Sequence, residues 1–497
     1  MSVSPTVEWW QPPTCQPPES SSSWDALRTY RTLAEDACLR PTGTGEGNHP
    51  PPNRVYAHLT TKRGYVRHAT PHENYRGVMG RGIRMSGLVL LAAVMAACSG
   101  GGEETASTTS GRSTSTVAET APTTAEPSAP TAAAPVENFR AVLITTGDEH
   151  ACALDGEGRA WCWGYGESGR LGDGSGEDAA TPVPVATDAR FRLLSAGRTF
   201  TCGISTDERT LCWGGNSRGQ LGDGTTGGGS GDADQPSPGA VLGDRSFADL
   251  AAAQLHACAL DEDGAVWCWG AYPSGQLGVA VNNDQTAPVR AGGDLRLVKL
   301  GQGGDTSTCG IDTDGAAWCW GGNAFGQLGD GTRSNAAQPE PRPVVGGRTF
   351  RALALGRTHA CGIDLDGTLW CWGRNEAGQL GDGTTEDRAE PVAVALEAPV
   401  RQVTANDRIT CAVTEDGRAW CWGANVDGRL GDGTVDDHIE PVEVSGGPIW
   451  EELHAGEAFT CGRTTDDAVF CWGAGQNGRL GDGSGEDHLL PVPVAAP

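Results

Sequence analysis

Residues 359–384 read HACGIDLDGTLWCWGRNEAGQLGDGT, and a Pro-Val-Ala-Val run follows at residues 391–394. Versions of this stretch recur six more times from Phe139 onward, and successive first cysteines lie 50 to 56 residues apart. Each repeat holds four short apolar segments separated by Gly-rich turns, which is the pattern of one propeller blade. The sequence therefore predicts an all-β, seven-bladed β-propeller over residues 136–497, in which each blade is a four-stranded antiparallel sheet.

A second cysteine follows the first by ten residues in every repeat. If Cys258 faces Cys268 across a hairpin, a three-residue loop remains and Gly264 takes its left-handed position. Opposed residues in such a pair have Cα atoms roughly 4.5 to 5.5 Å apart, within reach of a disulfide. In an exported protein we expect a disulfide in every hairpin, with free core thiols or a structural zinc site as alternatives. The expected pairs are Cys152 with Cys162, Cys202 with Cys212, Cys258 with Cys268, Cys309 with Cys319, Cys361 with Cys371, Cys411 with Cys421, and Cys461 with Cys471.

The same hairpin register makes a prediction about packing. The residue after each first cysteine is Ala or Gly, and a large side chain stands opposite it, as Trp370 does opposite Gly362. Large over small at every repeat predicts packing between blades rather than ligand stacking. In the second repeat Glu208 replaces the loop glycine, so a different turn is expected there.

The repeated polar residues suggest no catalytic chemistry. The Asp of LGDGT can hydrogen-bond its own turn, and the acidic spacing does not match a known calcium cage, although calcium stays an alternative. His150, His256 and His359 share a position at which the seventh repeat has Phe459, which favours a structural role. No GxSxG, HExxH, P-loop or dinucleotide motif occurs in the repeats. We therefore predict no catalytic, cofactor or metal site.

Charge is distributed unevenly along the chain. The formal net charge is −27, yet the first 97 residues hold 10 of the 36 Lys and Arg and only 7 of the 63 Asp and Glu. The repeats and the segment before them are therefore strongly acidic. An acidic surface repels phosphate backbones, so the sequence argues against nucleic acid as a partner.

An export signal precedes the repeats. Arg81 and Arg84 are followed by an apolar run at residues 87–97, which has the length of a signal-peptide core. The run ends in Met-Ala-Ala before Cys98, which resembles a bacterial lipobox, although Met95 departs from the usual Leu. We expect residues 79–97 to be a lipoprotein signal peptide and Cys98 to carry the lipid, which would place the protein on the outer face of a membrane. A non-cleaved anchor segment or a buried strand is the alternative.

The segments on either side of this signal lack a folding pattern. Residues 1–78 show no sustained hydrophobic periodicity and are left unassigned; an over-extended gene model or a disordered cytoplasmic tail would account for them. Residues 98–135 are almost wholly Ser, Thr, Ala, Gly, Pro and Glu, a composition that does not fold and is typical of a tether. A tether of this length spans on the order of 35 Å.

The string WGxNxxGQLGDGT, present at Trp320–Thr332 and Trp372–Thr384, resembles the repeat of the regulator of chromosome condensation family. This resemblance covers roughly residues 139–497 and implies a seven-bladed propeller. The eukaryotic namesake is a nucleotide-exchange factor on chromatin, a role that the acidic repeats and the lipobox contradict. Another secreted relative inhibits β-lactamases. Because such scaffolds carry many functions, the resemblance does not settle this one.

Binding is the predicted function, because a specific ligand must use positions that do not repeat. The second repeat carries a Gly-rich insertion at residues 226–239, and the third replaces LGDGT with the irregular turn 277–284. We expect both on one rim, with Tyr272, Val279, Val281 and Asn283 contacting a protein or glycan partner, and an enzyme-inhibitor role within that class. Neutral drift of tolerant loops is the alternative reading. The alternative function is a lyase or hydrolase at the central funnel, which a cluster of non-repeated His, Glu or Arg would favour.

Ring closure gives one further expectation. We interpret the first repeat as lacking a clear Pro-Val-x-Val strand of its own, whereas Pro491–Val494 ends the chain. We expect this C-terminal strand to add to the first blade, with Pro135 and Val136 as the competing segment.

Overall fold

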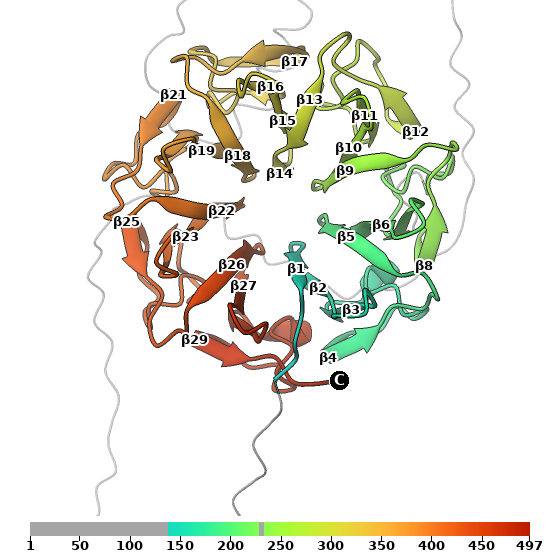
Figure 1. The fold of residues 1–497 in the computed structure, drawn as a ribbon, viewed down its shortest axis with the longest axis vertical. Helices are drawn as coiled ribbons and strands as arrows, with labels where there is room; N and C mark the ends of the chain where they lie inside the picture. Colours follow the sequence, from blue (N-terminus) through green and yellow to red (C-terminus); the bar gives the residue numbers. More distant parts are fainter. Residues whose placement is uncertain (1–137, 228–232) are drawn as a thin grey trace, which may run out of the picture. The chain divides into compact units, whose positions relative to one another are not determined.

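The computed structural model describes residues 138–227 and 233–497, which form seven antiparallel sheets arranged in a ring (Figure 1). The predicted all-β, seven-bladed propeller is confirmed. Cys98 and residues 1–135, with the predicted signal peptide and tether, lie outside the described residues. From the channel outwards the blades are β1 (Leu143–Thr146), β2 (His150–Leu154), β3 (Ala160–Gly164) and β4 (Ala179–Pro184); β5 (Phe191–Ala196), β6 (Phe200–Ser205), β7 (Thr210–Gly214) and β8 (Gln235–Ala240); β9 (Phe247–Ala252), β10 (His256–Asp261), β11 (Val266–Gly270) and β12 (Gln285–Arg290); β13 (Leu297–Leu300), β15 (Ser307–Asp312), β16 (Ala317–Asn323) and β17 (Ser334–Pro343); β18 (Phe350–Leu355), β19 (His359–Asp364), β20 (Leu369–Gly373) and β21 (Arg388–Ala393); β22 (Val400–Asn406), β23 (Ile409–Thr414), β24 (Ala419–Gly423) and β25 (His438–Glu443); and β26 (Trp450–Ala455), β27 (Phe459–Thr464), β28 (Val469–Gly473) and β29 (His488–Pro493).

The hairpin between the second and third strands of each blade has the predicted register. In blade 3, Cys258 faces Cys268 and Ala259 faces Trp267. All seven expected cysteine pairs form disulfides, with Cα atoms 4.0 to 4.1 Å apart. Seven structural disulfides indicate an oxidising or extracellular environment.

The second tryptophan of each Trp-Cys-Trp strand joins neighbouring blades. Trp422 is fully buried, and its Nε1–H donates to the carbonyl oxygen of Gln379 in the preceding blade at 3.0 Å. Gly381, at φ +68°, lies directly under this indole, where an added Cβ would come within 2.6 Å of Nε1. The LGDG loop of one blade therefore packs against the buried tryptophan of the next blade, and this close approach explains the recurring glycine.

The first tryptophan is only half-buried. Trp370 lies opposite Gly362, as the large-over-small pattern predicts, and packs against the core between blades. Its Nε1–H donates to the Asp364 carboxylate at 2.8 Å. Packing between blades is thus the observed role of the first tryptophan. The second tryptophan, here Trp372, is the fully buried one of the pair.

The turn at Glu208 corrects an expectation. Glu208 takes the left-handed conformation at φ +66°, and its N–H donates to the Ser205 carbonyl at 2.9 Å. Gly264 makes the equivalent bond to Asp261. The second repeat therefore keeps the common turn, because the flanking strand register outweighs the modest steric cost of a left-handed Glu.

Ring closure differs from the prediction, which was wrong. Strand β29 pairs with β28 inside blade 7, and blade 1 has its own outer strand β4. The first repeat does contain the motif, as Pro182-Val183-Pro184-Val185, so no exchanged strand is needed. The ring closes through the joint used elsewhere: Ala141 N–H donates to the Asp467 carbonyl at 2.9 Å, as Val400 N–H does to Gly367.

Candidate functional site

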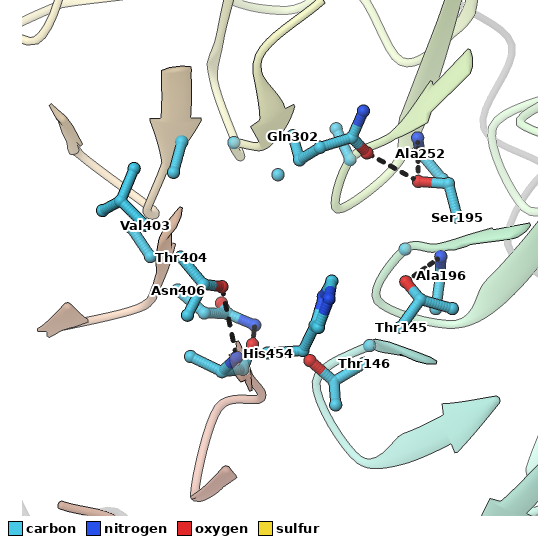
Figure 2. Close-up of a pocket in the computed structure, with 18 of the residues that line it drawn as sticks. Thr145, Thr146, Ser195, Ala196, Ala252, Gln302, Val403, Thr404, Asn406 and His454 are labelled. Atoms are coloured by element: carbon cyan, nitrogen blue, oxygen red, sulfur yellow. Dashed lines mark hydrogen bonds between the residues drawn. The ribbon is translucent and has the colours of Figure 1, made fainter. Parts of the chain in front are cut away.

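The inner strands enclose a central cavity of about 430 Å³ that is lined by residues of all seven blades (Figure 2). The inner strand of each blade is the edge of its sheet. Its backbone amides that do not pair with the second strand therefore need other acceptors. Neighbouring blades supply them: Thr145, Ser195 and Thr404 hydroxyls accept from the amides of Ala196, Ala252 and Ala455 at 3.1, 2.9 and 3.3 Å. Much of the polar wall therefore serves to tie blades together.

Blade 4 breaks the symmetry of this wall. Strand β14 (Gln302–Gly303) pairs in parallel with β18 of blade 5 rather than continuing β13. Gln302 then reaches toward blades 2 and 3: its Nε2 donates to the Leu250 carbonyl at 3.4 Å, and its Oε1 accepts from the Ser195 hydroxyl at 3.2 Å. Figure 2 shows this side chain extending along the cavity wall.

A non-repeated Glu, His and Arg meet in blade 7. His454 projects into the channel (Figure 2), and its Nε2 lies 3.7 Å from Glu452. Arg463 Nε–H donates to Glu452 at 2.9 Å. Burial raises the pKa of Glu452, but the hydrogen bonds and charges of His454 and Arg463 outweigh it and lower the pKa to about 2. Sequence reasoning missed this group, although Glu452 and His454 alternate along one strand and so share a side.

The turns that follow the inner strands and the loops that carry LGDGT share one side of the ring, here called the loop face. Tyr165 N–H donates to the Glu149 carbonyl at 3.0 Å, which joins the two kinds of loop within blade 1. The described parts of the irregular loops of the second and third repeats follow β7 and β11 and lie on this face, as predicted from equivalent strands. The regular stretch that precedes the second-repeat insertion contacts the end of the third-repeat turn, since Arg218 pairs with Asp284 at 3.1 Å.

The four predicted contact residues differ in burial. Tyr272 and Val279 are half-buried and pack against the core between blades 3 and 4. They replace the Asn and Asp that hydrogen-bond each other in other blades, as Asn375 does with Asp382 at 3.0 Å. Val281 is half-buried and Asn283 is exposed. The binding role of all four stays a prediction, and the structure adds a packing role for the first two.

The three repeated histidines are buried at blade interfaces. His359 Nε2 lies 2.9 Å from the Thr410 hydroxyl of the next blade, which itself donates to the Gln379 carbonyl, so Nε2 is the donor. Nδ1 has no partner among the described residues. Burial lowers the pKa of His150, His256 and His359 to about 3, with the charge of Arg170 adding to the effect at His150.

The LGDGT aspartates are engaged within their own turns. Asp382 Oδ1 accepts from the Thr384 amide at 3.0 Å and from the Thr384 hydroxyl at 2.7 Å, while Oδ2 accepts from Arg388. These bonds favour the turn interpretation over calcium. Within residues 138–227 and 233–497, no three His, Cys, Asp or Glu side chains are grouped as metal ligands. The same residues contain no helix long and apolar enough to cross a bilayer.

Comparison with known proteins agrees with the geometry. The RCC1-like domain matches residues 98–403, and the regulator of chromosome condensation (RCC1) repeat matches residues 400–429, 416–462 and 466–497. The ultraviolet-B receptor UVR8 of Arabidopsis thaliana is 30% identical over 254 residues, which are 51% of this chain and 57% of UVR8. The human E3 ubiquitin-protein ligase HERC2 is 27% identical over 263 residues, 52% of this chain and 5% of HERC2. The chain thus spans little more than half of the first relative and a small part of the second.

Solved structures show the same fold. Human WBSCR16 superposes with a TM-score of 0.58 at 22% identity, covering 64% of this chain and 86% of that one. Prp20p from Saccharomyces cerevisiae superposes with a TM-score of 0.61 at 20% identity, covering 72% and 88%. With the family match extending over more than half of its length, the chain belongs to the RCC1-like family of β-propellers.

Proposed function

We propose that this protein is an exported binding module whose loop face holds a protein or glycan partner, and that a lipid on Cys98 attaches it to the outer face of a membrane. The main support for this proposal is that the repeated residues and the irregular loops have different roles in the ring. Repeated residues join blades, whereas the irregular segments of repeats two and three follow equivalent strands, β7 and β11, in neighbouring blades that the Arg218–Asp284 ion pair joins on the loop face. Prp20p, which shares the fold, binds Gsp1p and histones, which supports a protein partner. Inhibition of an enzyme would be one form of such binding.

Catalysis at the funnel is the second candidate, and Glu452 with His454 is the observation that favours it. Glu452 is committed to the fold, because its Oε1 accepts from both Arg463 and the Ile144 amide of blade 1. A carboxylate held this way orients His454 but is not free to exchange protons with a substrate. Binding is therefore the function that we propose.

The loop face can be tested by transplanting a regular turn. Residues 279–284 are replaced by the fifth-repeat sequence of residues 382–387, together with Tyr272→Asn. Asp284 and Asp387 accept the same backbone bond, at 3.0 and 2.8 Å, so the loop keeps its anchor. A partner found by proximity labelling of the wild-type protein should bind the variant at least about tenfold more weakly, because contacts at an interface centre carry most of the energy. The melting temperature should barely change.

The matched control lies on the opposite face, where Glu262→Leu copies the fifth-repeat hairpin. This variant should bind the partner normally. Equal affinity of the partner for the wild type and the loop variant would remove the loop face from the proposal.

Anchoring has its own test. We expect mass spectrometry of the membrane-fraction protein to find a mature N-terminus at Cys98 with attached acyl chains, because two or more chains are needed for stable anchoring. Cys98→Ser should release the protein or leave its precursor unprocessed. An unmodified Cys98 with residues 79–97 still attached would exclude the lipoprotein.

A further inference from the structure

Seven equivalent residues surround the channel where it opens on the loop face. Each lies four positions before the first cysteine of its repeat, in the turn after the inner strand. Four are carboxylates and two are arginines, so this channel mouth carries a net negative charge. The channel mouth comprises Asp148, Arg198, Gln254, Asp305, Arg357, Asp407 and Glu457.

The two arginines leave part of the mouth uncompensated. Arg357 is shared between Asp305 at 3.4 Å and Asp407 at 3.6 Å, and Arg198 pairs with Asp148 at 3.5 Å. No ion pair involves Glu457 within the described part of the chain, although its amide donates to the Asp148 carbonyl at 3.0 Å. Blades 6, 7 and 1 thus present three carboxylates in succession.

The electrostatics of Asp148 agree with an excess of negative charge. Burial raises the pKa of this carboxyl to about 7, and the charges of Glu457 and Asp407 push it in the same direction, while Arg198 and Asn406 oppose them. A cation placed at the mouth would relieve this repulsion.

Gln254 provides an independent sign of a ligand. It is 9% exposed and lines the cavity, yet within the described residues its side chain makes no hydrogen bond. Its amide lines the cavity and can donate to and accept from a ligand group that enters the mouth. Its Oε1 is an acceptor, and carboxylates stand across the mouth from it.

We propose that the channel mouth binds a cationic side chain, arginine or lysine, that a protein partner inserts when it docks on the loop face. This rests on the proposed function and names the chemistry of its partner. A guanidinium or ammonium group donates several hydrogen bonds, so it can satisfy carboxylates and the Gln254 amide together. A metal ion fits less well, since no three acidic or histidine groups converge as ligands among the described residues.

The test uses the protein spanning residues 98–497 and two short peptides that differ in one group, acetyl-Gly-Arg-Gly-amide and its citrulline counterpart. Titration calorimetry or chemical-shift titration should show weak binding of the arginine peptide and none of the neutral peptide. Glu457→Gln should lower the affinity for the arginine peptide roughly tenfold, because a charge-assisted hydrogen bond becomes a neutral one. Glu262→Gln on the opposite face is the control and should change nothing.

The results of these experiments distinguish failure of the cation site from failure of the proposed function. Equal binding of both peptides, unchanged affinity in Glu457→Gln, or displacement of the arginine peptide by micromolar calcium would overturn the cation site. The melting temperature of Glu457→Gln should equal that of the wild type, so a loss of binding reports on the mouth. A partner that is lost on loop transplantation yet binds Glu457→Gln normally would leave the loop face standing without the mouth.

Discussion

Complete reduction of the seven disulfides should prevent the propeller from folding at room temperature. Each closes a loop of about ten residues, for which the loop-entropy relation gives roughly 2 to 3 kcal/mol of stability. Seven such contributions approach 20 kcal/mol, whereas a folded domain is usually stable by only about 5 to 15 kcal/mol. Protein unfolded in denaturant with a thiol reductant and then diluted into reductant should show no native near-ultraviolet circular dichroism, while the oxidised protein regains it.

A single pair gives the quantitative version. Cys361→Ala with Cys371→Ala should lower the free energy of unfolding in urea by about 2 to 3 kcal/mol plus a packing loss, since both sulfurs are fully buried. The matched control is the same double substitution measured in reduced protein under stabilising osmolyte, where only the packing loss remains. Native spectra in the fully reduced wild type would show that the blades do not depend on the crosslinks.

Acid should destabilise the propeller well above the pKa of ordinary carboxylates. Burial lowers the pKa of His150, His256 and His359 to about 3 in the folded protein, against about 6.5 in an unfolded chain. The unfolded state therefore takes up these protons first, so stability is complete above pH about 6.5 and is lost as the pH falls toward 3. Each histidine contributes about 1.4 kcal/mol per pH unit within that window.

Asp148 acts in the opposite direction but does not cancel the effect. Its pKa of about 7 lies above the unfolded value, so the folded state gains stability as the pH falls from about 7 toward 4. One carboxyl opposes three histidines, and stability still falls. Urea unfolding at pH 7.5, 6 and 5 should show a steady decrease.

The chain itself supplies the matched variants for this test. Each of the three histidines hydrogen-bonds a threonine of the next blade, as His359 does with Thr410. In the seventh repeat Phe459 replaces the histidine, Ala151 replaces the threonine, and the two residues belong to the same core cluster. His→Phe with Thr→Ala at the three interfaces should flatten the dependence on pH. The reverse change, Phe459→His with Ala151→Thr, should steepen it. A pH profile unchanged by both would assign acid sensitivity to other groups.

Local patterns made the blade predictable. Strand alternation, a ten-residue cysteine offset and a loop glycine fix the hairpin within a few residues of sequence, so the Cys258–Cys268 register could be predicted without a partner strand. The prediction of ring closure was wrong because the first repeat carries its own outer strand, which includes Pro182 to Pro184. The prediction of a different turn at Glu208 was wrong because the paired strands on either side hold Glu208 in the left-handed conformation.

The contacts between residues of the channel mouth were harder to predict from the sequence, for a different reason. Glu457 and Asp148 are more than 300 positions apart and become neighbours only through ring closure, while Arg357 gains its two carboxylates from the blades on either side. Aligning the repeats on the residue four positions before each first cysteine would have exposed the pattern. The parallel pairing of β14 with β18, which directs Gln302 toward blades 2 and 3, has no comparable signal, because it depends on how the backbone of one inner strand adapts to its neighbours.

Because each crosslink joins residues of one hairpin, and the four antiparallel strands of each blade come from one stretch of chain, assembly need not wait for the last residue. If the protein is exported as proposed, the chain that emerges from a translocation pore can oxidise its first hairpin after a few dozen residues, and each later sheet can pack in turn against the one before it. Wrong pairings are discouraged by order of arrival, since a cysteine meets its nearest partner before the next repeat appears. The contacts between the first and last blades, such as Ala141 with Asp467 and Phe139 with Val494, must wait until the end, which makes them the natural checkpoint between a string of finished sheets and a closed ring.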